Sequence, residues 1–169
     1  MDLQLSPVHA HAINGECYAV SLSVNTATNA NVRIGVGIFP NNIAKSVFIY
    51  RAVISNTDTG DADISITANS AMDSNFTSVL TPVNLQLGSA NTSLCTVMGS
   101  PSGATAPTGT AGRRIAVYPV VGTNLGFECF KNGSGIYIPA NTLSQAALFY
   151  VKVPTAGKYA DIDIEYIEY

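Results

Sequence analysis

The end of the chain alternates between apolar and polar residues with a period of two. In residues 160–169 the apolar side chains fall on one parity and the carboxylates on the other, the first set being Ile162, Ile164 and Tyr166 and the second Asp161, Asp163 and Glu165. Because successive side chains of a strand point to opposite faces, this run predicts a strand with one buried and one wet face. Residues 146–153 are apolar on both parities except at Lys152, which predicts a strand covered on both sides or one lying against a partner subunit. We expect these two strands to close a sandwich.

Similar patterns predict strands through most of the chain. They cover residues 18–24, 32–39, 46–54, 62–68, 80–87, 94–98, 115–121, 125–131 and 135–138. Residues 46–54 are the richest in β-forming side chains and are predicted as a central strand, whereas Pro82 places 80–87 on a sheet edge. Gly35 and Gly37 share one strand face, so another backbone or a large side chain is expected to come close there. Asn132 and Gly133 predict a hairpin turn between the last two strands of this set.

The spacing of these strands predicts the fold class. Turn signals recur roughly every 8–12 residues and no helical period of useful length is present. Such a pattern of about 8–10 strands predicts an all-β fold, and the eight principal strands favour an antiparallel β-sandwich of jelly-roll type. The 169 residues, 47% of them hydrophobic, suffice for one core and therefore one domain.

Two segments depart from the strand pattern. Residues 1–14 have no clear period, and Pro7 with the His-Ala-His run of His9 and His11 predicts an extended N-terminal arm before a sandwich domain over 15–169. Residues 99–114 begin with small, turn-forming residues and are predicted as a long flexible loop that ends in Arg113 and Arg114. Loops of this length without structure of their own are usually functional or disordered.

The amino-acid composition restricts the kinds of partner that we expect. Only 11% of the residues are charged, against about 25% in an average domain, so the surface is built largely from neutral polar residues. This is typical of a protein packed against copies of itself or a larger assembly, although a secreted β-domain has the same character. The net charge of −3 gives no electrostatic reason to bind nucleic acid. No apolar run approaches the ~20 residues that span a bilayer, and the start does not read as a signal peptide, so we expect synthesis in a cytoplasm and no membrane partner.

The candidate metal ligands have simpler interpretations. His9 and His11 would share one face of a strand and suit a metal ion if three copies met on a symmetry axis, but a polar arm is the preferred interpretation. Asp58, Asp61 and Asp63 surround a glycine and could serve calcium, yet their spacing does not match an EF-hand, and Asp and Gly are ordinary turn residues. We therefore predict no metal ion and no cofactor.

The three cysteines and the pair of arginines each have more than one interpretation. Cys17, Cys95 and Cys129 are odd in number and form no C-x-x-C pair, which favours buried free thiols over one disulfide or a reactive thiol. Arg113 and Arg114 are interpreted as the solvated start of a strand, or as an arm that docks on an acidic neighbour through bidentate contacts to carboxylates.

The chain lacks the residues of familiar catalytic sites. Its two histidines both lie in the N-terminal arm, away from any nucleophile that they would activate. No G-x-S-x-G, P-loop or dinucleotide motif is present, and the carboxylates of residues 161–165 alternate in the way of a wet strand face. The prediction is therefore a protein that is not an enzyme.

Several stretches resemble small phage virion proteins. They are G-I-Y-I-P-A-N-T, P-T-A-G-K and I-E-Y-I-E near the end of the chain, and K-S-V-F-I-Y-R-A-V-I-S-N-T and L-T-P-V-N-L-Q-L-G before them. Over about residues 45–169 the chain is similar to jelly-roll capsid decoration (cement) proteins and head-fibre proteins.

The resemblance implies a structural role. It implies a homotrimer, made in the host cytoplasm and located in the virion, that binds the major capsid protein or other virion proteins and stabilises the shell. The candidate contact residues are Pro7, His9, His11, Arg113 and Arg114. The alternative is a receptor-binding or carbohydrate-binding module at a tail or fibre tip, with exposed tyrosines in place of the absent tryptophan. A lectin-like surface domain unrelated to phage is the third possibility.

Overall fold

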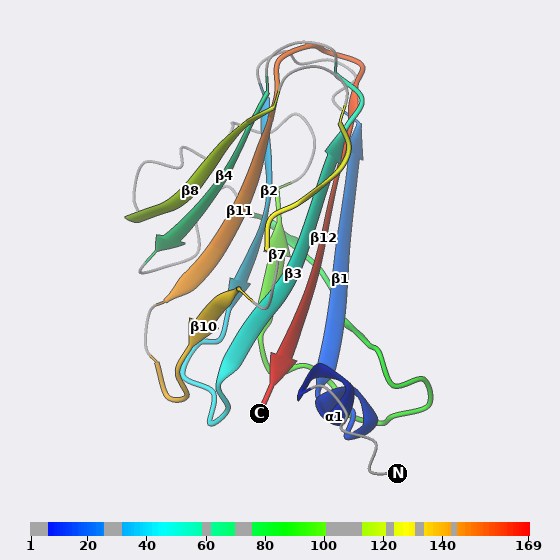
Figure 1. The fold of residues 1–169 in the computed structure, drawn as a ribbon, viewed down its shortest axis with the longest axis vertical. Coiled ribbons are helices and arrows are strands. Elements are labelled where there is room, and N and C mark those ends of the chain that lie inside the picture. Colours follow the sequence, from blue (N-terminus) through cyan, green and yellow to red (C-terminus); the bar gives the residue numbers. More distant parts are fainter. Residues whose placement is uncertain are drawn as a thin grey trace.

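The described residues of the computed structural model form a β-sandwich. They are residues 7–25, 32–58, 62–69, 76–100, 113–120, 124–130, 134–142 and 145–169. Sheet A contains β1 (Cys17–Asn25), β3 (Val47–Asn56), β6 (Val83–Asn84), β9 (Asn124–Glu128), β10 (Ile136–Ile138) and β12 (Tyr159–Glu168). Sheet B contains β2 (Val32–Phe39), β4 (Ala62–Asn69), β5 (Ser78–Val79), β7 (Thr96–Gly99), β8 (Arg113–Val120) and β11 (Ala146–Val153). The two antiparallel sheets face each other (Figure 1), which confirms the predicted all-β sandwich.

The long strands pair in a nested order, from the two ends of the chain toward its middle. β1 pairs with β12, β2 with β11, β3 with β9 and β10, and β4 with β8. The strands β1 to β4 alternate between sheets A and B, and β10, β11 and β12 alternate again. The chain is therefore a long antiparallel ribbon wound into two layers, in which β11 and β12 occupy inner positions of opposite sheets.

The core lies between the sheets. On β12 the predicted parity is confirmed, because Ile162, Ile164 and Tyr166 are fully buried while Asp163 on the other parity is exposed. On β11 the face toward the core includes Phe149 and other buried residues. Each fully buried side chain of this size contributes about 1.5–3 kcal/mol to stability, which makes this interior the main source of the fold's stability.

A second apolar cluster covers the outer face of β11. Leu148 and Tyr150 are buried there against Phe76, with Phe39 and Met98 packed around them. The strand is thus covered on both sides, as predicted, and the cover comes from the same chain. A Cβ on Gly35 would lie 2.8 Å from Phe76 and 2.9 Å from Tyr150, which confirms that large side chains approach the backbone there.

The prediction of an extended arm over residues 1–14 is wrong for Pro7–Ile13, which form the helix α1. Residues 1–6 lie outside the described residues. Proline is well tolerated at the first helical position, because its missing N–H would have no partner there. Because positions two apart on a helix do not share a face, His9 and His11 do not form the paired strand ligands expected from the sequence.

The prediction of a strand over 80–87 is wrong for most of that range. Only β6, with its two residues, pairs with β1, and residues 85–88 bend and turn. The polar positions of residues 80–87 have another role, because the side chains of Asn84 and Gln86 donate hydrogen bonds to the backbone carbonyls of Gly15 and Ile13. β6 does lie at an edge of sheet A, as Pro82 indicated.

The hairpin predicted at Asn132 and Gly133 is also wrong. Those two residues lie outside the described ranges, but β9 and β10 do not pair with each other, since both pair with β3, one after the other along the same edge. The long loop predicted over 99–114 is shorter at both ends, because Gly99 belongs to β7 and Arg113 and Arg114 belong to β8. Residues 101–112 lie outside the described part. No helix within the described ranges has the length and apolar character to cross a membrane.

Candidate docking surface

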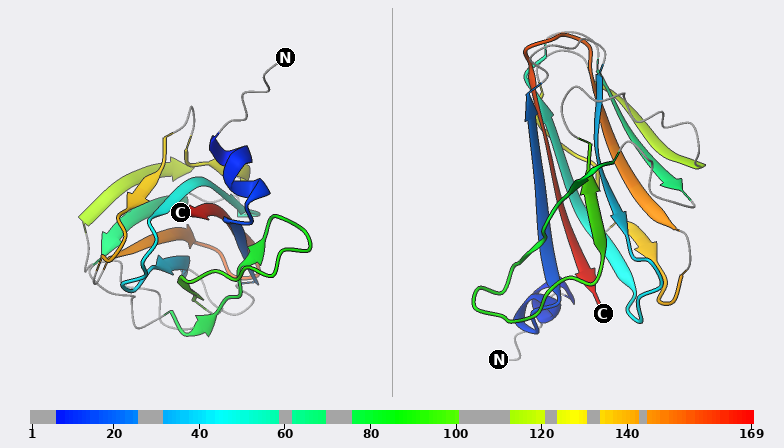
Figure 2. Two further views of the ribbon diagram at one scale, coloured as in Figure 1. Left: turned by 90° about the horizontal axis from the view of Figure 1, so that it is seen from below. Right: turned by 180° about the vertical axis from the view of Figure 1, so that it is seen from behind.

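One end of the sandwich carries the helix, the C-terminus and a long excursion of the chain. We define the α1 pole as α1, residues 14–16, residues 83–95 and Tyr169. Figures 1 and 2 show residues 85–95 as a loop beside α1, at the end of the molecule where the C-terminus also lies. The pole brings together segments that are far apart in the sequence.

His11 and Glu16 fasten α1 to the pole. The imidazole Nδ1 of His11 lies 2.6 Å from Oε2 of Glu16, and the His11 ring packs against Tyr169 with 5.1 Å between centroids. Lys45 places its Nζ 3.5 Å from the other carboxylate oxygen of Glu16. The hydrogen bond with His11 and the charge of Lys45 lower the pKa of Glu16. Beneath the helix, the Cys17 thiol lies 3.6 Å from the carbonyl oxygen of Val8.

Amide side chains fix the loop to the turn after α1. Asn84 donates to Gly15 O at 2.9 Å, Gln86 donates to Ile13 O at 2.7 Å, and Asn91 donates to the carbonyls of Gly15 and Asn14. Gly15 is required there, because its φ of 68° is left-handed and a Cβ would lie 2.6 Å from Gln86. The amide side chains of Asn84, Gln86 and Asn91 therefore hold the loop against α1 and the turn after it.

A buried carboxylate holds the end of the same loop. Glu168 is 1% exposed and accepts the amide N–H of Leu94 at 3.0 Å, the N–H of Cys95 at 3.2 Å and the hydroxyl of Ser93 at 2.5 Å. Ser93 also lies 2.6 Å from the hydroxyl of Tyr166. Glu168 departs from the carboxylate alternation of the chain end and falls on the buried parity of Ile162, Ile164 and Tyr166, but no local pattern indicates which groups it binds.

The apolar side chains of the pole point outward. Leu87 is 93% exposed, and four other aliphatic residues are also exposed: Ile13, Val83, Leu85 and Leu94. Sequence reasoning missed this surface, although a signal was present, because residues 74–112 contain no Asp, Glu, Lys, Arg or His. The hydrogen-bonded loop of residues 83–95 thus presents exposed apolar side chains and no charged ones.

The residues selected from the sequence lie in two separate places. Pro7, His9 and His11 belong to α1, and the side chain of His11 lies at the pole, while those of Pro7 and His9 are not described. Arg113 and Arg114 begin β8, opposite Ala68 and Thr67 of β4, at the outer edge of sheet B. Figures 1 and 2 place β8 on the far side of the molecule from α1. The structure therefore does not bring the two arginines to the α1 pole.

The described carboxylates among those considered for calcium or catalysis have hydrogen-bond partners, whereas the side chains of Asp61 and Asp63 are not described. Asp58 accepts from both the N–H and the hydroxyl of Thr155, at 2.7 and 3.0 Å. On the outer face of sheet A, Ser21 donates to Asp163 and Arg51 pairs with Glu165. Among the described residues no three His, Cys, Asp or Glu side chains group as metal ligands do, and Asp61 lies outside them.

The three cysteines are free and buried, as predicted. Burial is the main cause that raises the pKa of the Cys129 thiol to about 12, and it likewise raises the pKa of Cys95 above its ordinary value. Such thiols are inert, because the thiolate is the reactive form.

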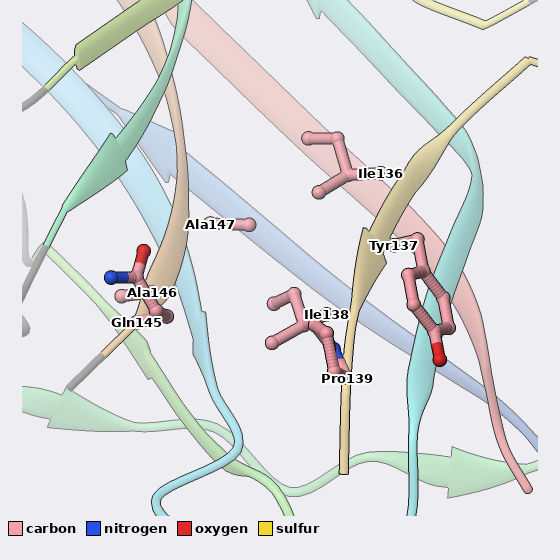
Figure 3. A pocket seen from close by; sticks show the side chains of 7 residues that line it. All are labelled: Ile136, Tyr137, Ile138, Pro139, Gln145, Ala146 and Ala147. Atoms are coloured by element: carbon pink, nitrogen blue, oxygen red, sulfur yellow. The ribbon is translucent and has the colours of Figure 1, made fainter. Parts of the chain in front are cut away.

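A small cavity opens between β10 and the start of β11. It measures about 230 Å³ and is lined by Ile136, Tyr137, Ile138, Pro139, Gln145, Ala146 and Ala147. Figure 3 shows Ile138 pointing toward β11 and the Tyr137 ring on the other side of β10. Specific small-molecule sites are usually larger, at about 300–1,000 Å³, and combine several convergent polar groups, so the α1 pole is the stronger candidate.

No protein-family model, no curated protein and no solved structure matches the chain.

Proposed function

We propose that this chain is a structural protein of a virion, a decoration protein that binds the outer shell of a capsid and stabilises it. The observation that carries the proposal is the group of exposed apolar side chains on the α1 pole, which includes Leu85, Leu87 and Leu94 in a stretch without charged residues. Exposed apolar residues that occur singly need no explanation, whereas several gathered on one rigid scaffold are typical of a protein–protein contact. The virion itself, the homotrimer and the capsid protein as partner rest on the resemblance described above.

The nested strand pairing supports the jelly-roll type of sandwich in this proposal. A jelly roll is an antiparallel ribbon of eight strands wound into two sheets of four. Pairing of β1 with β12, β2 with β11, β3 with β9 and β10, and β4 with β8 follows that scheme. The short strands β5, β6 and β7 belong to the excursion between β4 and β8, which also carries the exposed leucines.

The attachment is expected to depend on buried area rather than on charge. A stable protein–protein interface buries about 1,600 Å² in total, which a homo-oligomer can supply from several copies of one small surface. Because residues 74–112 carry no charge, binding through them should change little when salt is raised.

The experiment is to locate and count the chain in purified particles by quantitative mass spectrometry and particle imaging. Many copies spread over the shell would support decoration, while a few copies at a tail or spike would favour the receptor-binding alternative. Absence from particles would refute the virion role. Light scattering of the free protein tests the trimer separately.

Point variants then test the surface. Leu87→Ser combined with Leu94→Ser should abolish attachment to particles that lack the chain, because both side chains are exposed at the pole. The control is Tyr159→Ser, which removes a large side chain about as exposed as Leu94, at the other end of β12. Attachment that survives the double substitution would exclude the pole as the contact.

A further inference from the structure

The helix α1 is too short to be stable alone. It has seven residues and no acidic side chain in its first turn. Isolated helices shorter than about 12–15 residues are marginal in water, so α1 depends on its contacts with the sandwich.

α1 lies over a part of sheet A that would otherwise be exposed. Cys17 and Ile167 are cross-strand partners on β1 and β12, and both occupy the outer parity that carries Ser21 and Asp163 farther along the sheet. Yet Cys17 is fully buried and Ile167 is 2% exposed. The contact of the Cys17 thiol with Val8 O shows that α1 supplies this cover.

The helix is fastened by one carboxylate that contacts both a histidine and a lysine. Glu16 faces His11 of α1 through Oε2 and Lys45 of the β2–β3 connection through Oε1, at 2.6 and 3.5 Å. Tyr169 contacts the other side of the imidazole, and Lys45 also donates to the carbonyl oxygen of Glu168 at 3.2 Å. Within the described residues, neither His11 nor Lys45 has a second carboxylate partner, so protonation of Glu16 removes the carboxylate charge that both side chains contact.

We propose that Glu16 is an acid-sensitive latch, whose protonation releases α1 from the end of β1 and uncovers Cys17. The direction of the pH dependence follows from the lowered pKa of Glu16. A carboxylate of this kind contributes its stabilisation fully above its unfolded pKa, near 4.5, and loses it as the pH falls through the lower folded value. The latch is therefore closed at neutral pH and opens in acid. The inference is independent of the proposed function.

The accessibility of Cys17 reports the state of the latch. The full chain is treated with dithiodipyridine, a reagent that reacts with thiols in acid as well as at neutral pH, and labelling at each cysteine is followed by mass spectrometry. Rates are divided by the rate of glutathione at the same pH, which removes the intrinsic pH dependence of the reaction. Cys95 and Cys129, buried in the sandwich, report global unfolding.

Labelling of Cys17 should rise by up to about tenfold for each unit that the pH falls from about 4.5 toward the folded pKa of Glu16, and should level off below that pKa, while Cys95 and Cys129 remain protected. In the Glu16→Gln variant, the reagent should label Cys17 rapidly even at neutral pH. Glu128→Gln, which removes an exposed carboxylate beside Arg51, is the matched control and should keep Cys17 protected.

Two results would overturn the latch. One is protection of Cys17 in folded Glu16→Gln equal to that in the wild type. The other is simultaneous labelling of all three cysteines as the pH falls, which would mean global unfolding instead of local release. If Glu16→Gln does not fold, hydrogen exchange is measured in the wild-type protein across the same pH range. Release of α1 predicts that the α1 amides lose their protection at a higher pH than the amides of β12.

Discussion

Thr155 donates both its amide N–H and its hydroxyl to the carboxylate of Asp58, at 2.7 and 3.0 Å. Asp58 follows the end of β3 in sheet A and is fully buried, whereas Thr155 belongs to the connection between β11 and β12. The pair therefore ties that connection to the end of a neighbouring strand, at the opposite end of the sandwich from α1. The backbone N–H of Asp58 in turn donates to Oδ1 of Asn56 at 2.9 Å.

Asp58→Ala is expected to destabilise the protein by about 2–4 kcal/mol, because hydrogen bonds to a charged group contribute about 1.5–3 kcal/mol and the Thr155 amide loses its acceptor. Urea unfolding followed by circular dichroism measures the change. Thr155→Val removes only the hydroxyl bond and should cost about 1 kcal/mol. A double-mutant cycle with an interaction energy near zero would contradict a direct role for the pair.

Glu168 is expected to hold the loop after β6 in the same way at the α1 pole. Glu168→Ala removes the acceptor of the Leu94 and Cys95 amides and of the Ser93 hydroxyl, and should cost about 2–4 kcal/mol of unfolding free energy. Hydrogen exchange at the Leu94 and Cys95 amides should accelerate most.

The control for this substitution is Glu128→Gln, at an exposed site where ion pairs contribute little, about 0–1 kcal/mol. Unchanged protection of the Leu94 and Cys95 amides in Glu168→Ala would show that these amides have another acceptor.

The sequence predicted the strands well where one face is buried, and failed where long-range contacts decide. The parity of Ile162, Ile164 and Asp163 follows from the period of a strand, and the structure confirms it. In residues 80–87 the same alternation is produced by amide side chains that bind the turn after α1, a contact that no local pattern reveals. The short helix α1 is stabilised by packing against the sandwich, a contact that local helix propensity does not predict either.

The candidate site was less predictable than the fold. Arg113 and Arg114 attracted attention as charges, but the pole is distinguished by a lack of charge over residues 74–112. Glu168 lies 73–75 positions from the groups that it binds, so its role as an anchor is invisible before the strands are paired. Of the predicted contact residues, the structure places only the side chain of His11 at the pole.

Gly35→Ala tests the close packing over sheet B. An added Cβ would lie 2.9 Å from the backbone oxygen of Phe149 as well as against Phe76 and Tyr150, and the backbone cannot move aside cheaply. Overpacking of this kind costs about 1–3 kcal/mol. Gly99→Ala is the matched control, because its nearest neighbours at 3.1 and 3.2 Å are the flexible ends of Leu22 and Leu80. Equal stability of the two variants in urea unfolding would contradict the packing described for Gly35.

Leu87→Ser tests whether Leu87 stabilises the fold or serves in association with other proteins. Leu87 is 93% exposed, so the folded state gains almost nothing from burying it, and the substitution should change the unfolding free energy by less than about 0.5 kcal/mol. Removal of an exposed apolar group should at the same time raise solubility and weaken self-association, because association is what buries such a surface. Thermal unfolding measures the first effect, and sedimentation across a concentration series measures the second. Ile164→Ser, in the core, provides the opposite pattern, with a loss of several kcal/mol. A large loss of stability in Leu87→Ser would mean that this side chain is buried in the free protein, and the α1 pole would then not be an open docking surface.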